Sequence, residues 1–427
     1  MKPFAFAATR RFAPLFGTQF LGAFNDNLFK TALFVLIGFH GLGQGGWLPA
    51  QQLLNVGALL FVLPYFLFSA LAGQLATRYD KAALARWTKV LEMAVMALAG
   101  VGLVSGSAVL LLACLFVMGT QSAFFGPVKY AAIPEYLHER ELVTGNGLIE
   151  SGTFLAILFG QIAGTLLAGG GAWATAAVVL LLAAAGWACS LMMPALPPQR
   201  PDLPVDKNLW RGSRVLLRDT FARRDLTTAI VGISWFWLVG SVYTTQLPTL
   251  VRQHLHGNDH VFNLLLALFS LGIAAGSLWC AKLSGGRLQV KLAVAGAGVL
   301  AVCGAALAWL APPNADGVSV GLGGFLTQAA AYPVMLLVVG IGIGGGLFSV
   351  PLYTWLQTAG GSEFCARAVA ANNIVNGFFM VAGAVFSAAV LWLLDDVRWL
   401  YGTVAAGNVA VMAYLCARLP DKGGNAP

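Results

Sequence analysis

The chain has 427 residues, of which 58% are hydrophobic and only 10% charged, and its mean hydropathy is +0.78. So apolar a composition excludes a water-soluble globular protein and indicates an integral membrane protein. The net charge of +8 is interpreted as a sign of membrane topology and of contact with anionic lipid, and no nucleic-acid partner is expected.

Hydropathy marks twelve segments of roughly 20 residues, the length that crosses about 30 Å of hydrocarbon. They cover residues 14–39, 51–75, 83–104, 107–128, 146–168, 172–193, 226–250, 261–283, 290–311, 330–355, 368–393 and 398–418. Lys and Arg gather before the first segment, in every second connection and in the tail, with Arg252 and Arg398 as exceptions. The positive-inside rule therefore predicts that both termini are cytoplasmic.

The first segment contains the run L-G-A-F-N-D-N-L-F-K-T, which places Asn25, Asp26, Asn27 and Lys30 among apolar residues. A charge at the bilayer centre costs about 2.5 to 3.5 kcal/mol, so such residues usually face a cavity or a partner. Asp26 and Lys30 share a helix face, and a structural ion pair is one interpretation. We prefer a binding role, because the two asparagines add donors and acceptors that a simple pair does not need.

The connection after the second segment, G-Q-L-A-T-R-Y-D-K-A, resembles the Gly-x-x-x-Asp-Arg-x-Gly-Arg signature of the major facilitator superfamily. Gly73, Arg78 and Lys81 fit this conformational loop, whereas Thr77 stands where the acid is usual. Asp80 is the candidate substitute in the charge lock that the resemblance implies.

Charged residues also occur in segments three and five and at the end of segment four, just after residue 128. Lys129, beside Tyr130, follows a Gly-Pro pair and is either a cavity cation or a lysine that reaches the cytoplasmic surface. Glu150, one turn after Asn146, is either a helix-start acid or a cavity residue. Glu92 is expected to be structural, because Lys89 lies one turn before it.

A Pro-rich, basic stretch divides the chain into an amino-terminal bundle (1–193), a cytoplasmic linker (194–225) and a carboxyl-terminal bundle (226–427). Within the linker, Trp210, Leu216, Leu217 and Phe221 are predicted to share one face of an interfacial helix. Similar motifs recur in the same order in both bundles, which indicates a six-plus-six repeat. The expected fold is an all-α membrane protein of the major facilitator type, with twelve transmembrane helices in two six-helix bundles.

The second bundle offers little polarity beyond a few amides and hydroxyls, namely Thr244, Thr245, Gln246, Asn372, Asn373 and Asn376. Its run G-I-G-I-G-G-G-L-F predicts close helix packing. A cavity that is charged on one wall and apolar on the other suits an amphiphile. His254, His256 and His260 are expected in a solvated loop, with a metal site as the alternative. No enzyme motif occurs in a convincing context, and neither an enzyme nor a cofactor is expected.

The runs L-G-A-F-N-D-N-L-F-K, F-F-G-P-V-K-Y-A-A-I-P-E and G-N-G-L-I-E-S-G-T together resemble the bacterial lysophospholipid transporters, a branch of the major facilitator superfamily. The resemblance covers essentially the whole chain. It implies that Asp26 matches the family's intramembrane acid, Lys129 its span-four lysine, and Asn146 with Glu150 its span-five polar pair. These transporters can carry an arginine in span seven, where this chain has only Thr244, Thr245 and Gln246. Lys30 is a candidate replacement for that cation.

The resemblance also implies a function. The family moves lysophosphatidylethanolamine and lysophosphatidylglycerol from the outer to the inner leaflet of the bacterial inner membrane, where an acyltransferase restores the second chain. We therefore expect alternating access around Asp26, Lys30 and Lys129, in a monomer that supplies a cytoplasmic acyltransferase/acyl-carrier-protein synthetase. The alternatives are a proton-coupled transporter of another amphiphile or drug, with Asp26 as the coupling carboxylate, and a scaffold that transports nothing.

Overall fold

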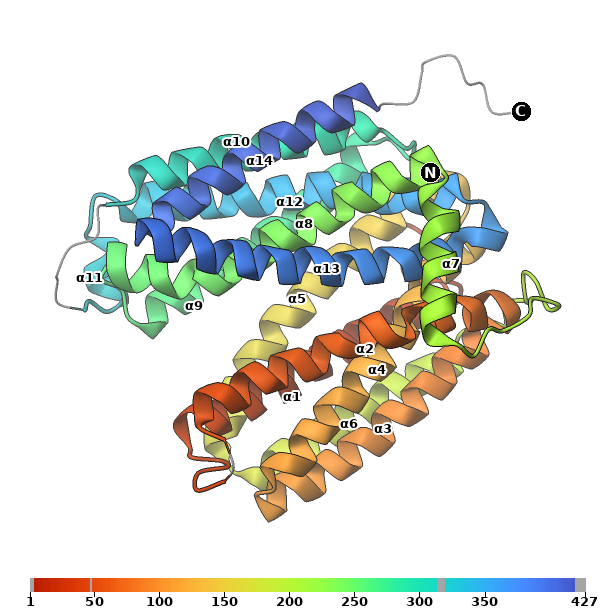
Figure 1. Ribbon diagram of the computed structural model, residues 1–427, viewed down its shortest axis with the longest axis horizontal. Coiled ribbons are helices and arrows are strands. Elements are labelled where there is room, and N and C mark those ends of the chain that lie inside the picture. The colour runs from red at the N-terminus through yellow and green to blue at the C-terminus, as the bar shows by residue number, and fades with distance from the viewer. Residues whose placement is uncertain (1–3, 47, 313–318, 419–427) are drawn as a thin grey trace. The chain divides into compact units, whose positions relative to one another are not determined.

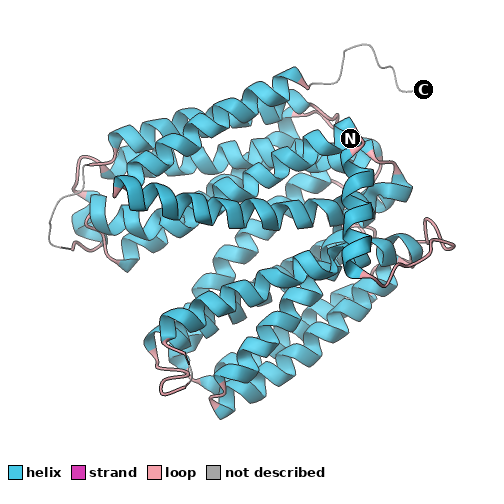
Figure 2. Cartoon of the chain, in the orientation of Figure 1, coloured by secondary structure: helices cyan, strands magenta, loops and turns pink. Residues whose placement is uncertain are grey.

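The computed structural model describes residues 4–46, 48–312 and 319–418. In these residues the regular structure is helical, apart from an isolated bridge between Gly257 and Val320 (Figures 1 and 2). Twelve described helical segments are long and apolar enough to cross a membrane. The prediction of an all-α chain with twelve spans is therefore confirmed.

The spans of the amino-terminal half are α1 (Ala13–Phe39), α2 (Ala50–Arg78), α3 (Lys81–Ser105), α4 (Ala108–Tyr136), α5 (Glu139–Gly170) and α6 (Ala172–Leu191). A shorter helix, α7 (Leu209–Phe221), follows the Pro-rich stretch. The next span joins α8 (Arg224–Thr249) to a π-helical turn, Leu250–His254. The remaining spans are α9 (Asp259–Leu283), α10 (Val290–Leu310), α12 (Ala331–Ala359), α13 (Ser362–Leu394) and α14 (Val397–Ala417), and a single turn, α11 (Leu322–Leu326), precedes α12.

Two helices extend well beyond the segments that hydropathy marked. Helix α4 continues through Pro127 and Pro134 to Tyr136, whereas the expected segment stopped at residue 128. Helix α5 begins at Glu139 with a capping box formed by His138 and Glu141, where residue 146 was expected. Charged residues lower the hydropathy of these turns, but a capped helix tolerates them where it leaves the apolar layer.

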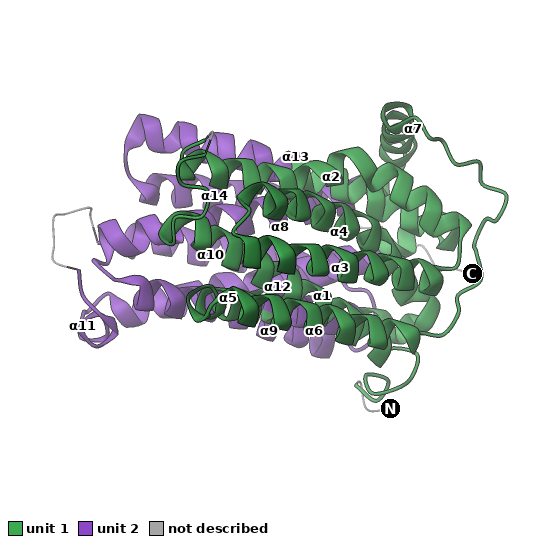
Figure 3. Ribbon diagram, turned by 90° about the horizontal axis from the view of Figure 1, so that it is seen from below, with its two compact units in different colours: residues 1–145, 155–226, 356–377 green, residues 146–154, 227–355, 378–427 purple. Residues whose placement is uncertain are grey.

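The described chain divides into two compact units (Figure 3). Unit 1 comprises residues 1–145, 155–226 and 356–377, and unit 2 comprises residues 146–154, 227–355 and 378–427. Parts of α5 and α13 thus pack with the unit opposite to their place in the sequence. The division into bundles at residues 193 and 226 remains a prediction.

Unit 1 has a core of buried side chains from α1, α2, α3, α4 and α6, including Phe29, Met96 and Leu115. Helix α5 approaches α1 closely at two glycines. A Cβ atom at Gly160 or Gly164 would lie 2.5 Å from a backbone carbonyl oxygen of α1, that of Phe24 or Leu28. Any larger residue there would push α1 away, and α1 carries Asp26.

Glycines bring α9 and α12 together in unit 2. A Cβ atom at Gly272 would lie 2.6 Å from the Val339 carbonyl oxygen, and one at Gly346 would lie 2.5 Å from the Ile273 carbonyl oxygen. The close packing predicted from the glycine-dense run of span ten is therefore confirmed.

The linker is anchored on the end of α2. The Arg200 amide donates to the Thr77 carbonyl (3.1 Å), and the Asp206 amide donates to Gln74 Oε1 (2.7 Å). Helix α7 forms as predicted, but Leu216 does not belong to the predicted apolar face: it is buried, whereas Trp210 is 80% and Phe221 44% exposed. Leu216 follows Trp210 by six positions, which places the two side chains about 120° apart around the helix axis.

Candidate functional site

The polar residues of α1 differ in their access to the surface of unit 1. Asn25 is fully buried, whereas Asp26, Asn27 and Lys30 are half-buried. The Asn27 side chain donates to the Ala23 carbonyl of its own helix (2.8 Å). Asp26 and Lys30 are therefore the groups of this run that combine charge with partial access.

A buried ion pair lies beside them on α3. Lys89 Nζ is 2.6 Å from Glu92 Oε2, and both side chains are at most 1% exposed. Asn25 Nδ2 donates to Glu92 Oε1 and Gln121 Nε2 donates to Glu92 Oε2, each at 3.3 Å. Such hydrogen bonds are what allow a desolvated pair to persist. The structural interpretation of Glu92 is thus supported, and Gln121 of α4 is a partner that the sequence analysis missed.

Two glycines make room for the Lys89 ammonium group. A Cβ atom would lie 2.7 Å from Lys89 Nζ at Gly22 of α1 and 3.0 Å from it at Gly186 of α6. The ammonium group is therefore enclosed by two helix backbones as well as by its carboxylate.

Asp26 takes its hydrogen bond from α4. Ser122 Oγ donates to Asp26 Oδ2 (2.7 Å) and lies 3.2 Å from Gln121 Oε1, which also competes for its single hydroxyl proton. The other carboxylate oxygen, Oδ1, is buried and has no hydrogen-bond partner among the described residues. Tyr65 of α2 interacts with both Ser122 and Asp26. Ser122 and Tyr65 carried no signal in the sequence, because isolated Ser and Tyr are common in membrane helices.

Asp26 and Lys30 do not form the close ion pair considered from their spacing. Among the ion pairs within 4.0 Å in the described residues, none joins these two side chains. Lys30 Nζ instead lies 5.0 Å from the centre of the Phe61 ring, a cation–π distance. The two side chains thus lie a helical turn apart and interact electrostatically without forming a direct ion pair.

The other candidate binding residues of unit 1 lie on α4 and α13. Lys129 is half-buried, with Nζ 4.5 Å from the centre of the Tyr130 ring. It lies inside α4, seven positions before the last residue, and not at the helix end as expected. The Tyr130 carbonyl accepts from Gln357 Nε2 (3.1 Å). Asn372 is buried and Asn376 is half-buried.

Four candidate residues belong to unit 2. Asn146 Nδ2 donates to Thr354 Oγ1 (3.1 Å), and Gln246 Oε1 accepts from Thr249 (3.1 Å). Glu150 is 1% exposed and lies eleven positions after the first residue of α5, so the helix-start interpretation is wrong. Thr244 donates to the Gly240 carbonyl of its own helix (2.8 Å).

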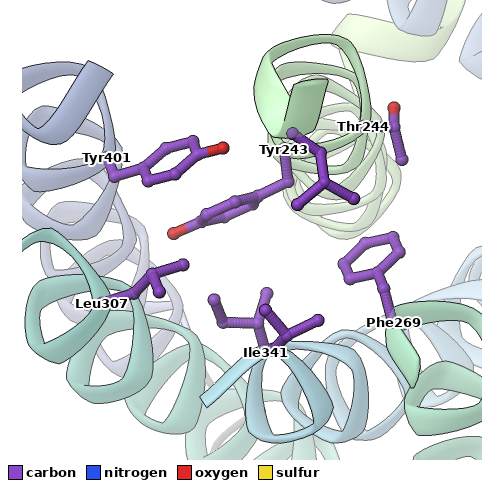
Figure 4. A pocket seen from close by; sticks show the side chains of 8 residues that line it. Tyr243, Thr244, Phe269, Leu307, Ile341 and Tyr401 are labelled. Atoms are coloured by element: carbon purple, nitrogen blue, oxygen red, sulfur yellow. The ribbon is translucent and has the colours of Figure 1, made fainter. Parts of the chain in front are cut away.

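Thr244 also lines a small pocket of unit 2 (Figure 4). The rings of Tyr243 and Tyr401 are 4.8 Å apart there, and both hydroxyl groups are buried without a partner among the described residues. The volume of about 10 Å³ corresponds to one water molecule at most. This pocket is too small for a lipid headgroup.

The charged residues of the loop between α2 and α3 do not form the contacts expected from the superfamily signature, in which Asp80 was to replace the usual acid. Asp80 Oδ1 caps α3 by accepting from the amides of Ala82 (2.7 Å) and Ala83 (3.1 Å). Lys81 is buried and pairs with Glu135 of α4 (2.7 Å). Arg78 donates to the Leu203 carbonyl of the linker (3.1 Å). Asp80 therefore serves as a helix cap, and Lys81 makes the ion pair.

Gly73 of the same motif is a packing residue. A Cβ atom there would lie 2.6 Å from the Ala370 Cβ of α13. The glycine therefore permits α2 and α13 to touch within unit 1.

The histidine expectation is wrong for His254. It is buried in the π-helical turn, its Nδ1 lies 2.7 Å from the Pro312 carbonyl oxygen, and its Nε2 lies 3.4 Å from Asp396. No group of three metal-ligating side chains occurs in the described residues. Span seven ends in the π-helical turn Leu250–His254, and this additional turn places the histidine side chain in the interior.

Comparisons with known proteins agree with this architecture. Residues 15–384 match the family model described as Major Facilitator Superfamily. A protein of an Enterobacter species (strain 638), "Lysophospholipid transporter LplT", is 30% identical over 366 residues, which cover 83% of this chain and 82% of that protein. The LplT protein of Cronobacter sakazakii is also 30% identical, over 84% of this chain and 81% of its own.

A solved structure gives the same picture of the fold. That of the human organic anion transporter MFSD10 (TETRAN) has a TM-score of 0.75 and 15% sequence identity, and the match covers 94% of this chain and 99% of that one. Identity this low bears on the fold only.

Proposed function

We propose a lipid-transport function for this chain on the premise that it belongs to the Major Facilitator Superfamily and, within it, to the lysophospholipid transporter family. The chain is a multi-pass membrane transporter. Its proposed cargo is a lysophospholipid such as lysophosphatidylethanolamine or lysophosphatidylglycerol. The proposed direction is from the outer to the inner leaflet of the bacterial inner membrane.

The observation that carries this proposal is the arrangement of Asp26 and Lys30. Both are half-buried, they lie one turn apart on α1, and neither neutralises the other within 4.0 Å. A lysophospholipid headgroup has an anionic phosphate and, in the ethanolamine lipid, an ammonium group. Lys30 would bind the phosphate and Asp26 the ammonium group, by charge-assisted hydrogen bonds.

Neighbouring groups support these roles. Ser122 orients the Asp26 carboxylate through a 2.7 Å hydrogen bond. The sealed Lys89–Glu92 pair keeps the charge around Asp26 balanced, because it adds one cation and one anion. Lys129 is proposed as a second phosphate ligand.

The remaining steps follow from this proposal. Transport would proceed by alternating access in a monomer, with both termini in the cytoplasm. Delivery to the inner leaflet would supply a cytoplasmic acyltransferase that restores the second acyl chain.

The test measures flipping of fluorescent lysophosphatidylethanolamine by purified protein in liposomes. Asp26→Asn and Lys30→Gln remove a charge with little change of shape. Each is expected to slow flipping about 10- to 100-fold, because a hydrogen bond to a charged group contributes about 1.5 to 3 kcal/mol. Asp225→Asn and Lys291→Gln, at exposed positions, are the matched controls and should flip at the normal rate. Full activity of both α1 variants would reject the assigned roles.

One observation favours a second candidate, a proton-coupled transporter of another amphiphile. Among the described residues Asp26 Oδ1 is buried without a hydrogen-bond partner, and carboxyl groups inside membrane helices are typical of proton relays in transporters. The same liposomes with an imposed pH gradient separate the candidates. Transport of a cationic amphiphile that collapses with the gradient, without lysolipid flipping, would favour the second. Wild-type protein that moves neither compound would indicate a scaffold.

A further inference from the structure

A basic pocket of about 350 Å³ opens in unit 1 where the linker meets the start of α13. Its charged lining consists of Arg200, Arg223, Arg367 and Glu363. Three guanidinium groups therefore face one carboxylate, and the Arg200–Glu363 contact is long, at 3.9 Å, with both side chains more than half exposed. With Asp219, which contacts Arg367 from α7, three arginines stand against two carboxylates, so the pocket keeps an excess of one positive charge.

An aromatic ring holds two of these guanidinium groups in place. Arg223 Cζ lies 4.2 Å and Arg367 Cζ 4.7 Å from the centre of the Phe364 ring. Arg367 also contacts Asp219 of α7 at 3.3 Å. A guanidinium group carries five N–H donors, so an arginine that stacks on a ring and has one other partner can still donate to a ligand.

The backbone adds to the positive potential. Gly361, with φ of 67°, precedes the first residue of α13, Ser362. Because glycine has no side chain, it cannot supply the oxygen that commonly caps the first amides of a helix. The positive end of a 33-residue helix therefore faces the same pocket as the three arginines.

Arg200 is held in position by main chain. Its amide donates to the Thr77 carbonyl at the end of α2. The pocket thus combines residues from the linker, the residues after α7 and the start of α13, and the backbone of Arg200 is anchored to α2.

We propose that this pocket binds a phosphate group. Planar guanidinium donors and helix amides match the oxygens of a phosphate ester, and 350 Å³ exceeds the space of several water molecules. The phosphate could belong to an anionic phospholipid of the adjacent leaflet or to a soluble phosphate ester, since both present the same oxygens. This site is separate from the lysolipid-binding residues proposed on α1, and binding there does not depend on transport.

The test uses purified, delipidated full-length protein and two probes. Inorganic phosphate is titrated by calorimetry, and retention of phosphatidylglycerol against phosphatidylcholine is measured by native mass spectrometry. The double variant Arg200→Ala/Arg223→Ala is expected to bind at least one probe about tenfold more weakly than wild type, the effect of losing about 1.4 kcal/mol. Arg287→Ala, an exposed arginine in the α9–α10 turn, is the matched control and should bind normally.

The two probes together identify the source of the phosphate. An effect on inorganic phosphate alone indicates a soluble ester, and an effect on phosphatidylglycerol indicates a lipid. Gel filtration verifies that the variants fold. If the double variant does not fold, the single variant Arg200→Ala is used in its place. Absence of binding of both probes to wild type, or equal binding by wild type and the folded variant, would overturn the proposal.

Discussion

At the scale of single residues, the main feature is that two pairs of charged residues differ in burial and in hydrogen bonding. Lys89 and Glu92 are sealed and satisfied by Asn25 and Gln121, whereas Asp26 and Lys30 remain apart and half-buried. A satisfied buried pair costs desolvation energy and is kept only where geometry compensates for it. The first pair therefore belongs to stability, and the second pair is the one available for binding.

The Lys89–Glu92 pair leads to a stability prediction. Glu92→Ala leaves the Lys89 ammonium group buried without its carboxylate and is expected to destabilise the protein by about 3 to 5 kcal/mol. The double variant Lys89→Met/Glu92→Leu should lose less than Glu92→Ala, because it leaves no buried charge. Thermal unfolding of purified protein in detergent measures both.

The control is an ion pair of similar length at the surface. Arg211 lies 2.6 Å from Asp206, but the arginine side chain is 71% exposed. Arg211→Ala should therefore leave the unfolding temperature unchanged. If Glu92→Ala also left the unfolding temperature unchanged, the buried pair would have no structural role.

At the scale of helices, glycine positions decide which elements touch. Gly160 and Gly164 allow α5 to pack closely against α1, and Gly73 allows α2 to contact α13. Glycines of α9 and α12 bring the backbones of those two helices together. The sequence predicted close packing from the glycine-dense run of span ten, but it did not indicate which helix would be the neighbour. That choice depends on where each backbone approaches another, which a one-dimensional pattern does not contain.

Gly276→Ala tests the α9–α12 contact. A Cβ atom there would meet the Ile343 backbone, 2.7 Å from its Cα and closer to its carbonyl oxygen. Backbone cannot rotate aside as a side chain can, so we expect a loss of about 1 to 3 kcal/mol of stability. Thermal unfolding again gives the measurement.

Gly240 of α8 is the matched position, since a Cβ atom there would have no neighbour within 4 Å. Gly240→Ala should stabilise the protein slightly, by about 0.5 to 1 kcal/mol, because alanine loses less conformational entropy in a helix. If Gly276→Ala also stabilised the protein, the packing of α9 against α12 would not depend on this glycine.

At the scale of the whole molecule, the charge distribution predicts the orientation in the membrane. Basic residues crowd the linker and every second connection, which the positive-inside rule assigns to the cytoplasm. The division into two six-helix bundles was expected at residues 193 and 226, and this division stays a prediction. The contact-based units take one short stretch from each opposite half, residues 146–154 and 356–377.

Cysteine labelling tests the orientation. In a Cys416→Ser background, which removes the exposed native thiol, Lys207→Cys and Asp259→Cys place single thiols at exposed positions. A membrane-impermeant maleimide should label Asp259→Cys in intact cells and Lys207→Cys only after permeabilisation. The reverse pattern would place both termini outside.

The amino-acid sequence by itself determined the number of spans, the all-α class and the polar run of α1, because hydropathy and helical spacing are local properties. It also paired Lys89 with Glu92, since one helical turn separates them. Tertiary structure decided which partners come from other helices: Gln121 and Ser122 reach α1 and α3 from α4, Asp80 caps α3 while Lys81 pairs with Glu135, and His254 is buried. These outcomes depend on helix rotation and packing depth, which distant parts of the chain set jointly.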